Sequence, residues 1–156
     1  MQATIEARIT NPVMLAPEAL KPLVAFSNVA TSSGVPRQTI DLVLLRASQI
    51  NGCAVCVQMH AADLRKAGET DERLFAVSAW RETPYFTGAE RAALALAEAG
   101  TRLADRRDPV PDEVWDEAAR FYDSKELAGL VIAIAGINAW NRLNVITRQV
   151  AGHYQG

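Results

Sequence analysis

The fold and the chemistry of this chain centre on one stretch, Asn51-Gly52-Cys53-Ala54-Val55-Cys56-Val57-Gln58-Met59-His60. It holds both cysteines of the 156-residue sequence and one of its two histidines. Residues three and four apart are neighbours on one face of an α-helix, so the spacing predicts a stripe of Cys53, Cys56 and His60. Gly52 favours the left-handed conformation that ends a preceding helix. Cys53 would then lie in the first turn of the next helix, where free N–H groups and the helix dipole stabilise a thiolate.

Two thiols and an imidazole in one stripe suit reversible dithiol/disulfide chemistry with a built-in proton acceptor. The spacing predicts an intramolecular disulfide between Cys53 and Cys56, as in other Cys-x-x-Cys sites. His60 follows Cys56 by four residues, so it can take a proton from that thiol directly or through one water. Cys53 is expected to be the more exposed of the two thiols, because Cys56 lies one turn deeper.

Length and charge indicate a single domain, residues 1–156, with no nucleic-acid or membrane partner. The 16 basic and 18 acidic residues give a net charge of -2, with no basic run for a nucleic acid or a membrane surface. The longest apolar run, residues 127–137, is too short to span a bilayer. The first residues do not have the pattern of a signal peptide, so the protein is expected to be cytoplasmic. There, a lone Cys-x-x-Cys pair is more often catalytic or metal-binding than structural.

Hydrophobic periodicity predicts an all-α fold, because no stretch after Pro17 alternates convincingly between apolar and polar residues. Residues 1–16 show only a weak strand signal, and they are expected to form an arm packed on another subunit. Thr87 and Glu90 form a predicted capping box. We expect a bundle of about six to seven helices. They are predicted near residues 17–30, 37–50, 53–67, 71–80, 87–103 and 124–150, with a further helix that starts at Pro111.

Two acidic residues could assist the stripe. Asp41 lies between Ile40 and Leu42 on a helix with few polar positions, so it is predicted to be a buried or half-buried carboxylate that faces a partner. We expect it to orient His60 and to raise the pKa of that imidazole. Asp63, three residues after His60, is interpreted as a solvated surface charge.

The last predicted helix is apolar almost all round from Leu127 to Trp140. Such a helix must be covered on all sides, which in a small domain favours a subunit interface. The tryptophans Trp80 and Trp140 are interpreted as packing and hydrogen-bonding elements.

The cysteine stripe and its surroundings resemble the alkylhydroperoxidase D / carboxymuconolactone decarboxylase family. The resemblance covers most of residues 36–146, with matching blocks at residues 41–60, 79–80, 86–94 and 137–143. It implies an all-helical homo-oligomer, a trimer or hexamer. It also implies a peroxidase branch that reduces hydroperoxides with the two cysteines, without metal, flavin or haem. An external dithiol reductant, thioredoxin-like or lipoyl-type, would then restore the thiols.

The resemblance, with the positions of the residues, assigns roles within the stripe. Cys56 is predicted to attack the peroxide, His60 to act as its base, Asp41 to orient His60, and Cys53 to be the resolving thiol. At two positions the chain departs from the peroxidase pattern. Asp41 stands where that pattern has Glu, and Val55 stands where it has a His between the cysteines.

Other interpretations of the stripe remain open at this stage. The cysteines could be ordinary buried residues. A zinc site would need further ligands, and His153 is the only other histidine. The protein could also be a non-enzymatic redox-responsive oligomer, or a decarboxylase-type enzyme acting on a small lactone acid.

Overall fold

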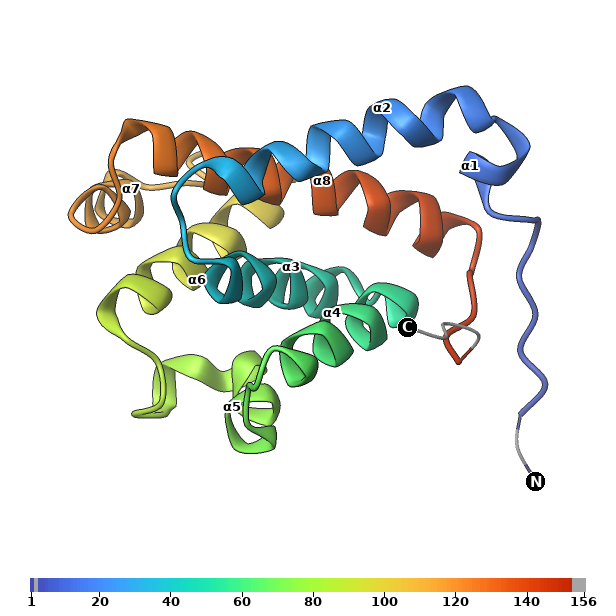
Figure 1. The fold of residues 1–156 in the computed structure, drawn as a ribbon, viewed down its shortest axis with the longest axis horizontal. Coiled ribbons are helices and arrows are strands. Elements are labelled where there is room, and N and C mark those ends of the chain that lie inside the picture. Colours follow the sequence, from blue (N-terminus) through green and yellow to red (C-terminus); the bar gives the residue numbers. More distant parts are fainter. Residues whose placement is uncertain (2, 153–156) are drawn as a thin grey trace.

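The chain folds into a helical bundle in the computed structural model, which describes residues 1 and 3–152 (Figure 1). Within those residues there are eight α-helices and two 3-10 helices, and no strand. In chain order the helices are α1 Pro12–Leu15, α2 Pro17–Asn28, η1 Val29–Ser32, α3 Arg37–Asn51, α4 Ala54–Lys66, α5 Asp71–Ala76, η2 Val77–Glu82, α6 Gly88–Thr101, α7 Asp112–Ala119 and α8 Ser124–Ile146. The predicted all-α class is confirmed, and each of the predicted helices has a counterpart.

The differences from the predicted helices lie at the ends of the chain. The one-turn helix α1 forms inside the segment that was expected to be an arm with a weak strand signal, because Asn11 accepts from the Val13 N–H and Pro12 occupies the first helical position. The last helix ends at Ile146, four residues before the predicted end at Val150.

The central element of the bundle is α3, which packs against α4, α6 and α8. Its apolar residues point in several directions, as the sequence predicted. Ile40 and Val43 join one core cluster, with α6 and α8. Leu42 and Leu45 join a second, with α4, α5 and η2. The cysteine pair belongs to a third cluster, which fills the space between the ends of α3 and α4 and the middle of α8.

The apolar helix α8 is covered largely by elements of its own chain, namely α2, α3, α6 and η1 (Figure 1). Leu130, Ala133 and Ile137 are buried, whereas Val131 remains 45% exposed. Much of the covering that its apolar surface requires is therefore met within the chain. A subunit interface through this helix stays a prediction.

A buried polar stripe on α8 fixes the end of α3. Asn51, the last residue of α3, donates from Nδ2 to Oδ1 of Asn138 and to Oδ1 of Asn141, both at 2.9 Å. Asn141 in turn donates to the hydroxyl of Ser48 at 3.1 Å. Because these groups are shielded from water, each pair satisfies donors and acceptors that would otherwise be costly to bury. The turn that carries the cysteines is thereby held against α8.

The described part of the N-terminal segment is exposed and forms no strand, and it is hydrogen-bonded to its own chain just after α8 (Figure 1). The Arg8 N–H donates to the Thr147 carbonyl at 2.9 Å, and Gln149 Nε2 donates to the Ile9 carbonyl at 3.0 Å. These bonds attach the base of the arm to its own chain, and packing of the arm on another subunit stays a prediction.

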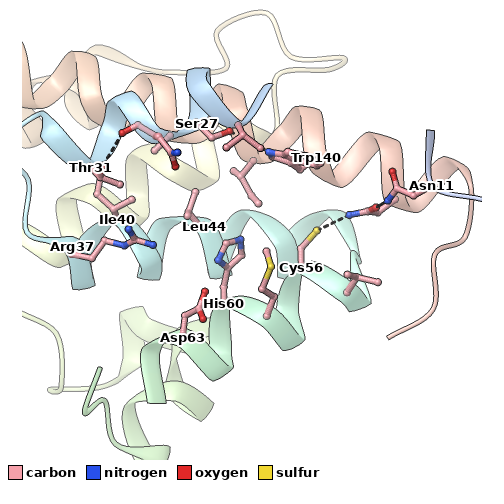
Figure 2. A pocket seen from close by; sticks show the side chains of 17 residues that line it. Asn11, Ser27, Thr31, Arg37, Ile40, Leu44, Cys56, His60, Asp63 and Trp140 are labelled. Carbon is pink, nitrogen blue, oxygen red and sulfur yellow. Dashed lines mark hydrogen bonds between the residues drawn. The ribbon is translucent and has the colours of Figure 1, made fainter. Parts of the chain in front are cut away.

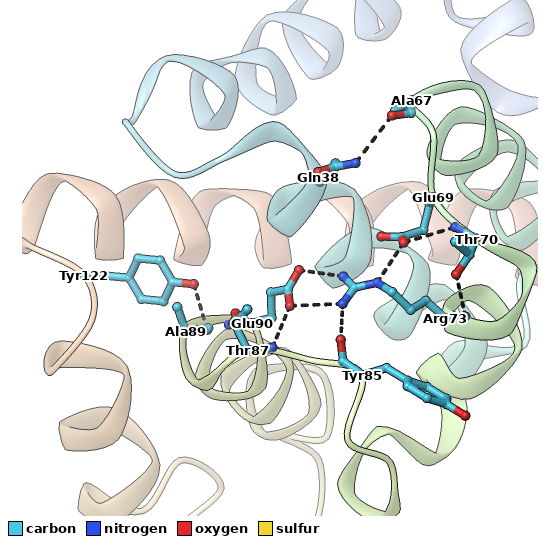
Figure 3. A network of polar contacts seen from close by, with 10 residues as sticks. All are labelled: Gln38, Ala67, Glu69, Thr70, Arg73, Tyr85, Thr87, Ala89, Glu90 and Tyr122. Atoms are coloured by element: carbon cyan, nitrogen blue, oxygen red, sulfur yellow. Dashed lines mark hydrogen bonds and ion pairs between the residues drawn. The ribbon is translucent and has the colours of Figure 1, made fainter.

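A second polar network joins α5 to the start of α6 (Figure 3). Arg73 pairs with Glu69 and with Glu90, each at 2.7 Å, and also donates to the Tyr85 carbonyl. Glu90 completes the predicted capping box with Thr87, which is confirmed. The network therefore anchors the turn after α4, and with it the far end of the helix that carries the cysteines.

The predicted role of Trp80 in packing and hydrogen bonding is also confirmed. Its ring is buried in the second core cluster, and its Nε1 donates to Glu98 at 3.0 Å. Glu98 also pairs with Arg46 at 2.8 Å, which ties η2, α6 and α3 together.

The turn between α3 and α4 depends on the backbone conformation of Gly52. Its φ is +68°, in the left-handed region, as the sequence predicted. In that conformation the N–H groups of Gly52 and Cys53 donate to the Gln49 and Ser48 carbonyls, which closes α3.

Replacing Gly52 tests how much the turn contributes to stability. A Cβ at this position would meet no atom within 4 Å, so Gly52→Ala changes only the backbone energy. We expect it to lower the free energy of unfolding by about 1–2 kcal/mol. Gly52→Asn should lose less, because Asn tolerates the left-handed region better. Urea denaturation measures both, and equal losses would show that the backbone conformation is not the cause.

Candidate active site

The Gly52 turn delivers Cys53 to the N-cap position of α4 and Cys56 to its first turn. The backbone N–H of Cys56 donates to Cys53 Sγ at 3.3 Å. Cys53 was predicted to lie within the first helical turn, and it lies one residue before it because its extended backbone precedes the helix. The two sulfurs form a disulfide, with the Cα atoms 5.3 Å apart, so the predicted intramolecular pairing is confirmed.

Both cysteines are buried, with 2% of Cys53 and 1% of Cys56 exposed. Cys53 was expected to be the more exposed thiol, and the structure shows almost no difference between the two. The reason is the α8 helix, whose Ile137 packs with Ala47 against the pair and covers both residues. A position at the start of a helix does not by itself make a side chain accessible.

The two cysteines nevertheless border different cavities. Cys56 lines a cavity of about 410 Å³ between α2, α3, α4 and α8 (Figure 2). Cys53 lines another, of about 290 Å³, next to the residues that follow α8. Asn144 borders both cavities. The walls of the larger cavity are mostly apolar, with Ile40, Leu44, Val55, Met59, Ala133, Ile137 and Trp140 among them.

His60 points from α4 into the larger cavity, on the same helix as Cys56 (Figure 2). It is only 7% exposed, and neither ring nitrogen has a hydrogen-bond partner among the described residues. Burial lowers the pKa of this imidazole to about 4; the negative charge of Asp63 opposes this shift, and the positive charge of Arg37 adds to it. His60 is therefore neutral near pH 7 and has a free nitrogen that can accept a proton.

Asp41 is buried, as predicted, but its hydrogen-bond partner is Arg37. The Arg37 Nε lies 3.0 Å from both carboxylate oxygens, one helical turn away. Burial raises the pKa of Asp41, and the bond to Arg37 opposes that rise. The structure does not bring Asp41 into hydrogen-bond contact with His60.

The expected rise in the pKa of His60 is also wrong, because burial of the imidazole outweighs the attraction of nearby carboxylates. The carboxylate that acts most on His60 is that of Asp63. Asp63 is half-buried and lines the cavity, so it is not the solvated surface charge that the sequence suggested.

The residue that the sequence interpretation missed is Asn144. Its Nδ2 lies 3.3 Å from Cys56 Sγ and 3.7 Å from Cys53 Sγ. The repeat of asparagines at Asn138, Asn141 and Asn144 was a signal that could have found it, since residues three apart share one face of a helix. Trp140, on the same helix, donates to the Ser27 hydroxyl at 3.1 Å, as predicted for a hydrogen-bonding tryptophan.

Comparison with known proteins identifies the family. Residues 17–99 match the carboxymuconolactone decarboxylase family. The chain belongs to this family. YdfG of Bacillus subtilis strain 168 is 38% identical over 131 residues, which cover 84% of this chain and 88% of that protein. The alkyl hydroperoxide reductase AhpD of Hyphomonas neptunium is 43% identical over 47 residues, 30% of this chain and 26% of that protein.

Solved structures show the same fold. A crystal structure from Agrobacterium tumefaciens, described as a candidate antioxidant defence protein AhpD, is 36% identical, with a TM-score of 0.88. The match covers 96% of this chain and 100% of that chain. The debrominase Bmp8 has a TM-score of 0.80 at 19% identity, over 90% of this chain and 75% of that chain, and shares the fold.

Membership of the carboxymuconolactone decarboxylase family confirms the resemblance inferred from the sequence. The matched region contains Asp41, Cys53, Cys56 and His60, whereas Asn144 lies beyond it. His153, the one other histidine that the zinc alternative could draw on, lies outside the described residues.

The unpartnered imidazole predicts a pH-dependent contribution to stability. Between pH 6.5, the ordinary pKa of a histidine, and pH 4, the unfolded chain binds more protons at His60 than the folded chain does. The contribution of neutral His60 is therefore fully present above pH 6.5 and is lost as the pH falls towards 4. Between these two pH values the protein should lose on the order of 2–3 kcal/mol of its free energy of unfolding through His60, and His60→Gln should not show this loss.

The measurement is urea denaturation of both proteins from pH 4 to pH 7. Gln carries no charge at any of these values, and all other titratable groups are common to the two proteins. Parallel stability curves would show that the pKa of His60 is not lowered on folding.

Proposed function

We propose that this protein is a thiol-dependent peroxidase that reduces hydroperoxides through a Cys53–Cys56 dithiol/disulfide cycle. The observation that carries the proposal is the geometry of the disulfide. It is buried and borders an apolar cavity, and His60 points into that cavity with neither nitrogen bonded to any residue that the structure describes. Membership of a family with AhpD relatives supports a redox role.

The proposed cycle begins with both cysteines reduced. The Cys56 thiolate attacks one oxygen of the hydroperoxide, the O–O bond breaks, and the leaving alkoxide takes a proton to become an alcohol. Cys56 is then a sulfenic acid. The Cys53 sulfur attacks it, water leaves, and the disulfide forms. An external dithiol reduces the disulfide and is itself oxidised, which restores both thiols.

His60 is proposed to move the proton in this cycle. In the disulfide form its pKa is about 4, so it is neutral and free to accept the proton of the Cys56 thiol after reduction. A thiolate formed at Cys56 attracts a proton to His60 and raises its pKa, since opposite charges stabilise each other. The imidazolium can then donate that proton to the departing alkoxide.

The two cavities suggest that one cysteine reacts with the peroxide and the other with the reductant. Cys56 borders the larger, apolar cavity, which suits the organic part of a hydroperoxide. Cys53 borders the smaller cavity and is proposed to meet the dithiol reductant. Because Cys53 is also buried, that exchange requires a local opening near the end of α8.

The assignment of roles is tested by trapping the sulfenic acid. After stoichiometric peroxide, Cys53→Ser should label at Cys56 with a dimedone-type probe, because no resolving thiol remains. Cys56→Ser should barely label at Cys53, because His60 is proposed to accept a proton from Cys56 and not from Cys53. Mass spectrometry locates the label, and peroxide consumption with a dithiol donor measures turnover in the parent protein.

The outcomes separate the proposed function from its alternatives. Labelling at Cys53 alone would reverse the two roles while leaving the dithiol chemistry in place. A protein that consumes no peroxide with any dithiol, and forms no sulfenic acid at either cysteine, would contradict the proposed function. A non-enzymatic redox-responsive oligomer or a decarboxylase-type enzyme would then be favoured.

A role for Asp41 in orienting His60 also belongs to the proposal. Asp41→Asn should then slow alkylation of the Cys56 thiol, and Asp41→Glu should preserve or raise the rate. The rates are compared from pH 5 to 8, a range chosen to bracket roughly the ordinary pKa of a histidine. Unchanged rates in Asp41→Asn would show that Asp41 does not orient His60 and only pairs with Arg37, at 3.0 Å.

A further inference from the structure

Two asparagine side chains connect the N-terminal segment to the cysteine pair. Asn144 Nδ2 lies 3.3 Å from Cys56 Sγ and 3.7 Å from Cys53 Sγ. Asn144 Oδ1 accepts a hydrogen bond from Asn11 Nδ2 at 2.9 Å. Figure 2 shows the two bonds as a continuous path from Cys56 to Asn11. We call Asn11 and Asn144 the asparagine relay.

The direction of the relay is fixed by the backbone of α1. An Asn side chain has one acceptor end and one donor end. The N–H of Val13 donates to Asn11 Oδ1 at 3.2 Å, so the donor end of Asn11 faces Asn144. The acceptor end of Asn144 must therefore face Asn11, and its donor end faces the sulfurs. A capped helix of one turn thus determines that an N–H group, not a carbonyl oxygen, meets Cys56.

We propose that the asparagine relay stabilises the Cys56 thiolate, with Asn144 as the hydrogen-bond donor and Asn11 as the residue that positions it. A hydrogen bond to a charged sulfur is stronger than one to a neutral sulfur. The donor therefore favours the thiolate over the thiol, and the reduced pair over the disulfide. The inference rests on the proposed function in one respect, which is that Cys56 reacts as a thiolate.

The relay acts among few other charged or titratable groups. The larger cavity contains His60 and Asp63 from α4 and Arg37 from α3, with Asp41 paired to that arginine. Arg148 borders the smaller cavity. The described lining residues that α2 contributes are uncharged, namely Val24, Ser27 and Asn28. All the charged groups are retained in the variants compared below, so they do not account for differences between them.

The direct test removes the donor. Asn144→Leu, made together with Cys53→Ser so that Cys56 is the only thiol, is compared with Cys53→Ser alone. We expect the pKa of the Cys56 thiol to rise by about one unit, in line with the loss of a hydrogen bond to a charged group. Below that pKa, the alkylation rate should fall roughly tenfold. The pKa is obtained from the iodoacetamide rate as a function of pH.

A second variant, again made together with Cys53→Ser, reverses the relay without changing α8. Asn11→Asp keeps an acceptor for the Val13 N–H and is a good N-cap, so α1 should remain folded. Its second oxygen accepts where Asn11 donates, so the amide of Asn144 should turn and present Oδ1 to Cys56. The thiol pKa should then rise at least as much as in Asn144→Leu. This variant also decides the question if Asn144→Leu fails to fold.

Asn28→Asp is the control for the added charge: it places the same charge at another residue that lines this cavity, more exposed than Asn11, whose backbone carbonyl accepts a hydrogen bond from Thr31. It should shift the thiol pKa less than Asn11→Asp does. Equal shifts in these two variants, or an unchanged pKa in Asn144→Leu, would overturn the inference.

Alkylation is measured without peroxide, so the relay and the proposed function can fail separately. Shifted pKa values in a protein that consumes no peroxide would support the relay and contradict the peroxidase. Peroxide turnover with unshifted pKa values would contradict only the relay.

Discussion

One side-chain amide holds the site in place. Both hydrogens of Asn51 Nδ2 are used, one for Asn138 and one for Asn141, and the end of α3 is fixed to α8 by these two bonds. The turn at Gly52 follows directly, and so does the position of Cys53 at the start of α4. Without the amide, the buried Asn141 Oδ1 would lose its donor, and Asn138 Oδ1 would keep only a longer bond from Arg142 at 3.4 Å, which is costly in the protein interior. The contact between α8 and the sulfurs depends on the same registration of the two helices.

Features that depend on neighbours along the chain were predictable from the sequence. The helices, the Gly52 turn, the disulfide and the stripe of Cys56 and His60 follow from helical spacing and backbone preference. The pairing of Asp41 with Arg37 was equally local, four residues apart, and could have been anticipated. The sequence interpretation instead predicted His60 as the partner of Asp41.

Features that depend on tertiary packing were not predictable in the same way. The burial of Cys53 is caused by α8, and the contact between Asn11 and Asn144 joins residues 133 positions apart. The direction of the His60 pKa shift is another example. A nearby carboxylate raises the pKa of an imidazole, but burial without a hydrogen-bond partner lowers it more. Only the packed structure shows which effect prevails.

The separation of the two cavities has a kinetic consequence for the proposed cycle. Some enzymes bind an oxidising and a reducing substrate in turn at one site. A high concentration of either substrate then lowers the turnover rate, because it occupies the site that the other needs. Here Cys56 and Cys53 border different cavities, with Asn144 between them. The oxidant and the electron donor therefore need not compete for the same space. The S–S bond alone would then link the place where the dithiol donates its electrons to the place where the peroxide accepts them.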